Sequence, residues 1–384
     1  AGLQPRFGLA GPRAGQPGPL VNRLDPPYDA LDPGGMAARI DGIPEQIEGA
    51  LALVGASPWP GMAWAKDRSR QGPALLALGG MGGSGIAADL TAGLNSDRAS
   101  RPVLVVRDYR WPAWLTAEAL AVLCSYSGNT EETLALYREA GERRVARAAI
   151  TTGGALAEAC ERDQVPWLKI PAGIPPRAAL FWSWVPLTAL VHSLGWSEDP
   201  KPAWGEAVAK LRDLKARLGT AVPEATNPAK QLARRIAGRP IYIYSGTERI
   251  AAVATRFRQQ LHENGKLLAH TGVVPELNHN EIVGWERPEA FHREVVLLVL
   301  RDAEDAPEVS TRLALTADYA RRQGAEVHWL EPYPGGRLAR LAQQILFGDY
   351  LSLYLALVRG VDPTPVASID EFKRRLSEAG AQHG

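Results

Sequence analysis

Three hydroxyl side chains, Ser125, Ser127 and Thr130, lie close together between a short apolar run and an acidic helix start. The apolar run, residues 120–123, is typical of a buried parallel strand, and Gly128 allows the backbone to turn tightly after it. The acidic residues that follow predict the first turn of an amphipathic helix, whose N-terminus offers unpaired N–H groups and the positive end of a dipole. An ordinary helix cap would explain one hydroxyl. Three hydroxyls without a lysine favour the phosphate of a small molecule over a nucleotide triphosphate.

A glycine-rich turn, GGMGGSGIAADL at residues 79–90, follows an earlier predicted strand. Gly80, Gly82 and Gly85 have the spacing of a dinucleotide-binding turn, and Asp108 lies at a plausible distance for a ribose-binding acid. A nicotinamide-dependent oxidoreductase is therefore an alternative. We favour a phosphate site, because the hydroxyl loop would open onto the same edge of the sheet and two phosphate-binding loops explain more residues.

Glu263 is a candidate general base near the end of a predicted helix, in the sequence HENGK. If its carboxylate faces a cleft, it can accept a proton from a carbon next to a carbonyl group. The alternative interpretation is a solvated carboxylate paired with Lys266. Glu276 and Glu281 are further candidates that spacing alone does not exclude.

Arg177 and His279 are the other candidates for chemistry. Two prolines precede Arg177 in IPPRAAL and fix its direction, so a substrate-facing position stands beside that of an ordinary surface arginine. His279 lies in NHNE, among polar groups that can fix its tautomer. None of the seven histidines forms an HExxH or a paired Cys/His pattern, so the sequence predicts no zinc site.

Strands alternate with helices along the chain, which predicts an α/β fold with mostly parallel sheets covered by helices on both faces. The predicted strands span 74–78, 103–106, 120–123, 148–150, 167–170, 241–244, 295–300 and 327–330. The predicted helices include 36–53, 155–162, 181–194, 204–218, 309–322, 338–358 and 368–379, and a further one follows residue 244 and runs to about His262.

The two halves of the chain resemble diverged copies. YSGTERIAAVAT after the strand at 241–244 parallels GGSGIAADLT after the strand at 74–78. The counterpart of the hydroxyl loop, however, is RDAEDAPEVS, whose carboxylates would repel a phosphate. We therefore expect two similar domains and one phosphate site.

At 384 residues, the chain is long enough for two domains. We predict a Pro/Gly-rich arm at 1–35, a first domain at 36–197 that binds phosphosugar, a connecting segment at 198–228, and a second domain with C-terminal helices at 229–384.

Composition indicates a soluble globular protein, with 46% hydrophobic and 22% charged residues. The net charge of +1 gives no reason to expect nucleic acid or a membrane surface as a partner. The sequence shows no signal peptide and no continuous apolar run long enough to cross a bilayer. Two cysteines cannot form a disulfide framework, so we expect a reducing, cytoplasmic location.

Five motifs in order, GMGGSGIAADL, SYSGNTEETL, PPRAAL, HENGK and ELNHNE, resemble those of the bifunctional phosphoglucose/phosphomannose isomerases. That family is built from two sugar-isomerase (SIS) domains, so the resemblance implies two three-layer αβα domains and a C-terminal helix. It also implies that the sugar phosphate is held by Gly82, Gly83, Ser84, Ser125, Ser127 and Thr130.

The resemblance further implies the roles of four residues. Glu263 would move the proton between C2 and C1, and Arg177 would steady the enediolate. His279 would come from the partner subunit of a homodimer and assist ring opening, and Lys373 in the last helix would serve the same step.

The implied reaction interconverts glucose 6-phosphate, and also mannose 6-phosphate, with fructose 6-phosphate through a cis-enediol. Such a route needs a base and stabilisation of an oxyanion, and it needs neither a redox cofactor nor a metal. The alternative is a protein of a different functional class, a non-catalytic regulator that binds a phosphosugar. That protein would need an attached DNA-binding segment, and the sequence shows no basic helix-turn-helix.

Overall fold

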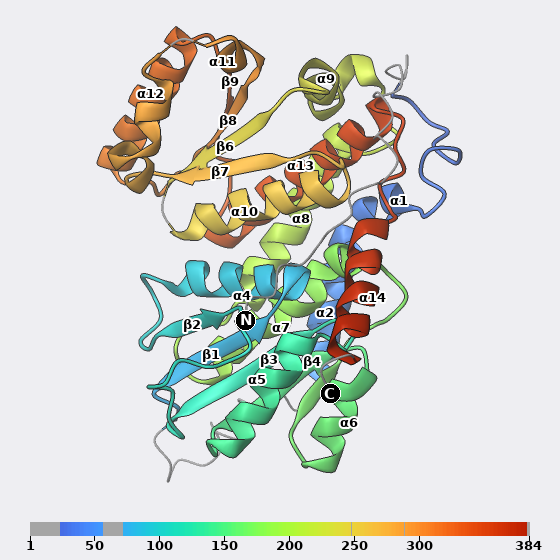
Figure 1. The fold of residues 1–384 in the computed structure, drawn as a ribbon, viewed down its shortest axis with the longest axis vertical. Coiled ribbons are helices and arrows are strands. Elements are labelled where there is room, and N and C mark those ends of the chain that lie inside the picture. Colours follow the sequence, from blue (N-terminus) through green and yellow to red (C-terminus); the bar gives the residue numbers. More distant parts are fainter. Residues whose placement is uncertain (1–23, 57–71, 247, 288, 382–384) are drawn as a thin grey trace, which may run out of the picture.

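The computed structural model describes residues 24–56, 72–246, 248–287 and 289–381. Most of the predicted N-terminal arm therefore lies outside the described residues. In the described part of the chain, two parallel β-sheets lie one above the other, with helices between them and on their outer faces (Figure 1). The α/β class and the two similar sheets are confirmed, whereas the domain boundaries stay a prediction.

The first sheet has the strand order β2-β1-β3-β4-β5, and all its neighbours are parallel. Its central strands β1 and β3 are apolar runs buried on both faces, as expected of a covered parallel sheet. The strands are β1 (Leu75–Gly80), β2 (Val103–Val106), β3 (Ala119–Ser125), β4 (Ala146–Thr151) and β5 (Trp167–Lys169).

The second sheet has the order β7-β6-β8-β9, again parallel throughout. This order matches the first four strands of the first sheet, so β6 corresponds to β1 and β8 to β3, which confirms the predicted duplication. The strands are β6 (Ile241–Ser245), β7 (Ala269–Val273), β8 (Val296–Leu300) and β9 (Glu326–Leu330). The sequence analysis missed β7, whose residues AHTGV contain no apolar run.

The helices between the sheets share one core with both of them. This core includes Leu76 and Val122 from the first sheet and Ile243 and Leu298 from the second. The helices that contribute to it are α1 (Met36–Asp41), α2 (Ile43–Ala56), α4 (Gly82–Asn95), α7 (Leu180–Ser193), α8 (Lys201–Leu218), α9 (Pro228–Ile236), α10 (Glu248–Glu263) and α13 (Arg337–Val358).

The outer faces carry separate, smaller cores. Leu136 and Leu156 pack under the first sheet, from α5 (Glu131–Glu142) and α6 (Gly154–Arg162). Leu313 of α12 (Pro307–Arg322) packs on the second sheet, near the short helix α11 (Ala290–Glu294). Four 3-10 helices connect the described elements: η1 (Pro176–Ala179), η2 (Glu224–Thr226), η3 (Glu276–His279) and η4 (Glu281–Trp285).

Helix α13 passes through the middle of the molecule. Within the described residues, it is the one helix that is long and apolar enough to cross a membrane, with a mean hydropathy of 1.3 in its most apolar window. That window is entirely buried inside the protein, so α13 is a core helix here.

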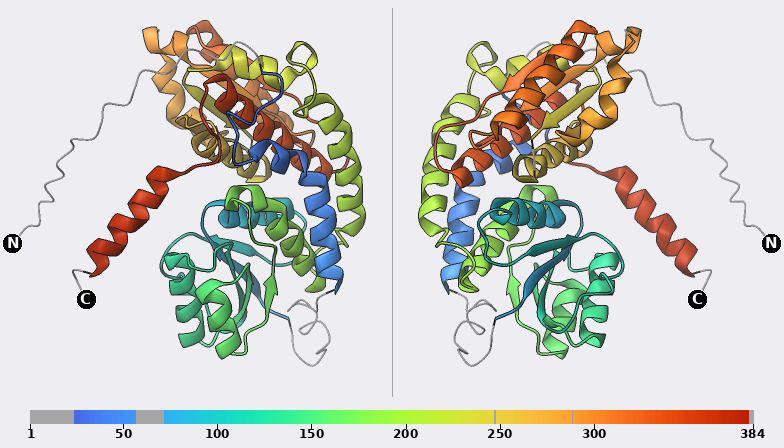
Figure 2. Two further views of the ribbon diagram at one scale, coloured as in Figure 1. Left: turned by 90° about the vertical axis from the view of Figure 1, so that its right-hand side faces the viewer. Right: turned by 90° about the vertical axis from the view of Figure 1, so that its left-hand side faces the viewer.

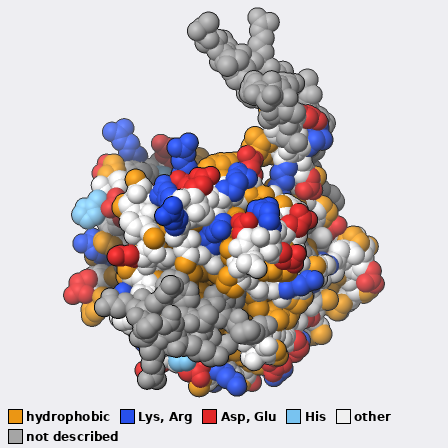
Figure 3. All heavy atoms as spheres, turned by 90° about the horizontal axis from the view of Figure 1, so that it is seen from below, with side chains coloured by type: hydrophobic (Ala, Val, Ile, Leu, Met, Phe, Trp, Pro, Cys, Tyr) orange, Lys and Arg blue, Asp and Glu red, His pale blue; other side chains and the backbone are white. Residues whose placement is uncertain are grey.

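On the face shown in Figure 3, basic and acidic side chains are interspersed, with no large patch of one sign.

Most of the predicted helices and strands are confirmed, with shifts of a residue or two at their ends. One prediction was wrong. The helix predicted over 36–53 is two helices, because Gly42 ends α1 before α2 begins. The helix predicted over 204–218 is confirmed as α8, and its Trp204 and Leu211 are fully buried in the central core.

The last helix, α14 (Ala367–Ala381), differs from the others because it stands out from the body of the molecule (Figure 2). In Figure 1 it points toward the end of the molecule that carries the first sheet, and Figure 2 shows it standing clear of the first domain.

Candidate active site

The glycine turn and the hydroxyl loop are brought together by the pairing of β1 with β3. In this parallel register, Gly80 lies opposite Cys124, so both loops leave the sheet at the same edge. The predicted convergence of Gly82, Gly83 and Ser84 with Ser125, Ser127 and Thr130 is therefore what the strand register produces.

The first turn of α4 requires glycine. Gly82 has a φ of 51°, in the left-handed region that favours glycine. A Cβ atom on Gly83 would lie 2.9 Å from the carbonyl oxygen of Pro176, so a larger residue would push the turn away from η1. The glycines thus let the start of α4 lie directly against the segment that carries Arg177.

The hydroxyl loop is ordered by its own hydrogen bonds. Ser125 Oγ and Thr130 Oγ1 are 2.9 Å apart, and the N–H of Gly128 donates to Ser125 Oγ over 3.1 Å. The exposed Ser127 hydroxyl accepts from the N–H of Asn129 over 3.2 Å. Within the described residues, no side chain caps the N-terminus of α4 or α5, so both helix starts can offer N–H groups to an anion.

Arg177 lies on η1 and is only 3% exposed. Its Nη1 is 3.3 Å from Glu263 Oε2, and its Nε donates to Asn264 Oδ1 over 2.7 Å. Its Nη2 donates to the carbonyl oxygens of Pro363 and Thr364, over 2.7 and 2.8 Å. Burial lowers the pKa of Arg177 below its ordinary value, and the Glu263 carboxylate opposes that change. The guanidinium therefore joins the first domain, the end of α10 and the segment before α14.

Glu263 is the last residue of α10, and its side chain is 27% exposed. Its carboxylate contacts Arg177, whereas the ammonium of Lys266 donates to the backbone oxygen of Glu263. The Glu263 side chain therefore pairs with Arg177, and not with the Lys266 side chain as in the alternative interpretation. A carboxylate that is partly open to solvent and held beside a buried cation is suited to exchange protons with a bound sugar.

Lys266 fixes the segment before α14. Its Nζ donates to the carbonyl oxygens of Pro363 and Pro365, over 3.2 and 2.7 Å. The left-handed residue after α10 is Lys266, with a φ of 52°, and not the glycine before it. Burial, and then the nearby Arg177, lower the pKa of Lys266.

Comparisons with known proteins show the family of this chain. The chain is 39% identical to the bifunctional phosphoglucose/phosphomannose isomerase of Caldicellulosiruptor bescii, over 79% of this chain and 89% of that protein. It is 32% identical to the protein of the same name from Aquifex aeolicus, over 78% of this chain and 89% of that protein. The chain belongs to the bifunctional phosphoglucose/phosphomannose isomerase family.

The second half of this family member also matches a family model. Residues 225–376 match the bacterial phospho-glucose isomerase C-terminal SIS domain. Among solved structures, tagatose-6-phosphate ketose/aldose isomerase from Escherichia coli has a TM-score of 0.64 at 16% identity, covering 87% of this chain and 97% of that one. The C-terminal domain of glucosamine-fructose-6-phosphate aminotransferase from Francisella tularensis has a TM-score of 0.62 at 16% identity, covering 85% and 96%. These two likenesses show the fold, and with the family model they confirm the two-SIS-domain architecture.

The other two predicted catalytic residues, His279 and Lys373, form no hydrogen bond or ion pair with Glu263 within the described part of the chain. His279 lies at the end of η3 and is exposed, with no hydrogen bond or ion pair in the described part of the chain. Lys373 is exposed on α14 and likewise has no acidic partner among the described residues.

The alternative candidates make other contacts. Glu281 accepts a 2.6 Å hydrogen bond from the Tyr244 hydroxyl, and Glu276 accepts from the side chain of Asn280 over 2.9 Å. Asp108, the possible ribose-binding acid, accepts from the N–H of Tyr109 over 2.6 Å. Within the residues that the structure describes, no group of three or more His, Cys, Asp or Glu gathers as a metal site would.

Sequence reasoning missed the residues that support Arg177. Asn264 is fully buried, and its side-chain amide donates to Ser352 Oγ over 3.0 Å. Arg256 donates to the backbone oxygen of Arg177 over 2.7 Å and forms a buried ion pair with Asp349 of α13 at 3.0 Å. One signal was available: Asp349 places a charge in the middle of the predicted helix at 338–358, within its most apolar part.

Proposed function

We propose that this chain is an aldose–ketose isomerase that interconverts glucose 6-phosphate and mannose 6-phosphate with fructose 6-phosphate. The observation that carries the proposal is the contact between the Glu263 carboxylate and the buried Arg177 guanidinium, 3.3 Å apart, at a segment that touches the glycine turn. Family membership and this pairing of a base with a cation support the same reaction.

The phosphate of the sugar binds to hydroxyl and N–H groups. The donors are the starts of α4 and α5 together with Ser125, Ser127 and Thr130, and no lysine or arginine is required among them. Binding at the sheet edge leaves the other end of the open-chain sugar to extend toward η1. Uncharged donors also suit the release of product, because no fixed ion pair has to be broken.

Glu263 transfers the proton. Its carboxylate takes the proton from C2 of the aldose, the electron pair forms the C1–C2 double bond of an enediolate, and the negative charge develops on oxygen. The proton is then returned to C1, while the hydroxyl hydrogen of O2 passes to O1, so that O2 becomes the ketose carbonyl and O1 becomes a hydroxyl. The substrate is oxidised at C2 and reduced at C1 within one molecule, so no external oxidant or reductant is consumed.

Arg177 stabilises the oxygen that becomes negative. Because the guanidinium is buried and held by Asn264 and two carbonyl oxygens, it does not have to reorganise as the charge appears. We expect it to exchange part of its contact with Glu263 for the enediolate oxygen when the sugar binds.

In our proposal, the opening of the sugar ring uses residues other than Glu263 and Arg177. His279, exposed at the end of η3, reaches the site of a second copy of the chain, so the enzyme is a homodimer. Lys373 belongs to α14, which begins two residues after Pro365, the residue held by Lys266. A cytoplasmic location also remains part of the proposal.

The test is a coupled assay of the purified protein in chelator, with each hexose 6-phosphate offered separately. We expect fructose 6-phosphate to form from both glucose 6-phosphate and mannose 6-phosphate. Tight binding of either sugar without turnover would overturn the proposal, and NADH fluorescence that responds to the protein would point to an oxidoreductase instead.

A further inference from the structure

Helix α14 exposes an apolar stripe. Ile369, Phe372 and Leu376 are spaced three and four residues apart, so they share one face of the helix, and they are 40%, 67% and 45% exposed. Figure 2 shows the helix standing away from the body of the molecule. A helix with such a face gains stability in water only when a partner covers the stripe.

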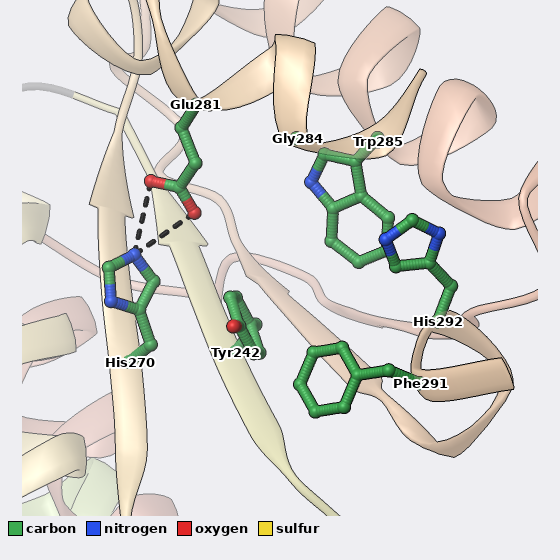
Figure 4. A pocket seen from close by; sticks show the side chains of 7 residues that line it. All are labelled: Tyr242, His270, Glu281, Gly284, Trp285, Phe291 and His292. Atoms are coloured by element: carbon green, nitrogen blue, oxygen red, sulfur yellow. Dashed lines mark hydrogen bonds and ion pairs between the residues drawn. The ribbon is translucent and has the colours of Figure 1, made fainter. Parts of the chain in front are cut away.

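An aromatic groove of about 400 Å³ lies on the second sheet. Tyr242 of β6 and Phe291 of α11 point into it from one side and Trp285 of η4 from another (Figure 4). Phe291 is 49% exposed, so the groove has uncovered apolar surface of its own. His270 and Glu281 form an ion pair of 3.0 Å at its edge.

The groove lies beside the residue that we propose to cross to a second copy. Glu281 and Trp285 of η4 follow His279 within six residues, and η3 and η4 pack together. If His279 of one copy enters the active site of another, the groove of the first copy lies next to that active site. Helix α14 of the second copy starts there, because Arg177 and Lys266 hold residues 363–365 at the active site.

The helix of the same chain points away from this groove. In Figure 1, α14 runs from the level between the two sheets toward the end that carries the first sheet, and in Figure 2 it stands clear of the first domain. The elements β6, β7 and α11 lie at the opposite end of the molecule. Its start is tethered, so α14 cannot turn to its own groove without releasing the contacts of residues 363–365. A second copy is the occupant that brings helix and groove together.

We propose that α14 of each copy docks its Ile369–Phe372–Leu376 stripe into the groove between Tyr242, Trp285 and Phe291 of the other copy. This inference rests on the proposed dimeric isomerase. Two equivalent exchanges about one twofold axis form a closed assembly, which leaves no groove unfilled. Lys373 flanks the stripe, and it has no acidic partner among the described residues. Docking would hold Lys373 at the seam that His279 also enters, with the carboxylate of Glu281 close to that seam.

The experiment uses two differently tagged full-length chains, one with Phe372→Cys and the other with Phe291→Cys, which are co-expressed and treated with a short bis-maleimide. We expect a covalent heterodimer on a denaturing gel. The native Cys124 and Cys160 are buried, so they compete little for the reagent. The matched control pairs Glu371→Cys, on the opposite face of α14, with Phe291→Cys and should give little product.

A second chain carries both Phe372→Cys and Phe291→Cys. Cross-linking between copies supports the proposal, whereas a link confined within one chain shows that α14 folds back and overturns it. Failure to link in either arrangement also overturns it, because both cysteines are exposed positions that the reagent can reach.

Charge placed on the stripe gives an independent measurement. Phe372→Asp with Leu376→Asp should weaken self-association roughly 10-fold or more, as measured by sedimentation equilibrium, and should reduce the helical circular dichroism signal by no more than the loss of α14 would. Unchanged self-association would overturn the proposal. Isomerase activity of the wild-type chain is measured in parallel: an active enzyme whose copies do not link refutes the docking alone, and linked copies without turnover refute the isomerase alone.

Discussion

The contact between Glu263 and Arg177 makes a specific prediction about proton transfer. Glu263→Gln keeps the size of the side chain and an oxygen for Arg177, but the amide cannot accept a proton. We expect kcat to fall by at least about 10²–10⁴-fold, while the affinity for fructose 6-phosphate changes little. Steady-state kinetics and calorimetric titration measure the two quantities.

Glu276→Gln is the matched control for this prediction, because Glu276 is another carboxylate that the sequence leaves as a candidate. Its contact is with Asn280, so the rate should stay close to that of the unaltered enzyme. A full rate for Glu263→Gln would remove that residue from the mechanism.

Asn264 acts on the reaction through Arg177. Its Oδ1 accepts from Arg177 Nε over 2.7 Å, and the residue is fully buried between α10 and α13. Asn264→Leu would leave a buried guanidinium N–H without an acceptor, which costs about 1–3 kcal/mol. If part of that cost appears only when the enediolate forms, kcat falls about 10-fold with KM little changed.

Asn264→Asp keeps the acceptor and should recover most of the rate, a result that loss of packing would not give. Ser352→Ala removes only the outer hydrogen bond and should have a smaller effect than Asn264→Leu. A change in KM alone would mean that Asn264 supports sugar binding and not the transition state.

At this scale, the sequence predicts which residue types are present but not which of them meet. Glu263 and Arg177 are 86 positions apart, and Arg256 and Asp349 are 93 apart, so no local spacing connects them. Resemblance to a family supplied the roles of Glu263 and Arg177. It supplied nothing for Asn264, whose role depends on a helix that packs against it from much later in the chain.

At the scale of elements, the two uncapped helix starts are what binds the phosphate in our proposal. Ser127→Ala with Thr130→Ala removes two hydroxyl donors but leaves the N–H groups of α4 and α5 in place. We expect KM for the phosphosugar to rise roughly 10²–10⁴-fold, because each of the two lost hydrogen bonds to a charged group contributes about 1.5–3 kcal/mol. The value of kcat should change little.

Thr311→Ala on α12 is the control, because that exposed hydroxyl only donates to the backbone of its own helix. Initial rates over a range of substrate concentration separate the two constants. An unchanged KM in the double variant would move the phosphate to another part of the molecule.

The elements that could be predicted are those with strong local patterns. Continuous apolar runs predicted eight strands within one or two residues, because strands covered on both faces bury every side chain. The strand β7 was missed since it lies at the edge of its sheet, where His270 stays exposed and an apolar run is not needed. The break at Gly42 was missed because the apolar spacing continues on both sides of it.

At the scale of the whole molecule, the duplication explains why one phosphate site is enough. The loop after β8 corresponds to the hydroxyl loop after β3, and it presents Asp302, Glu304 and Asp305. Glu304 accepts hydrogen bonds from Arg337 and Arg340 of α13, and Arg337 also pairs with Asp97 of the first domain at 2.6 Å. A carboxylate of the loop that corresponds to the hydroxyl loop therefore helps to join the two halves.

Because of this ion network, the free energy of unfolding depends on pH in the acidic range. Burial acts to raise the pKa of Glu304, but hydrogen bonds from Arg337 and Arg340 outweigh it and hold the pKa at about 2, below the ordinary 4.5. A group whose pKa is lower in the folded state stabilises it fully above its ordinary pKa, and that contribution is lost as the pH falls through the folded value. The contribution of Glu304 should therefore decline between about pH 4.5 and 2.

Glu304→Ala would leave Arg337 and Arg340, which are 7% exposed, without this acceptor. We expect a loss of about 3 kcal/mol in the free energy of unfolding at pH 7, where the carboxylate is charged, and a much smaller loss near pH 2. Urea unfolding at several pH values measures the difference, and Glu308→Ala, in the exposed first turn of α12, is the control. An equal loss at both pH values would assign the effect to packing, since only the ion pairs depend on the charge of the carboxylate.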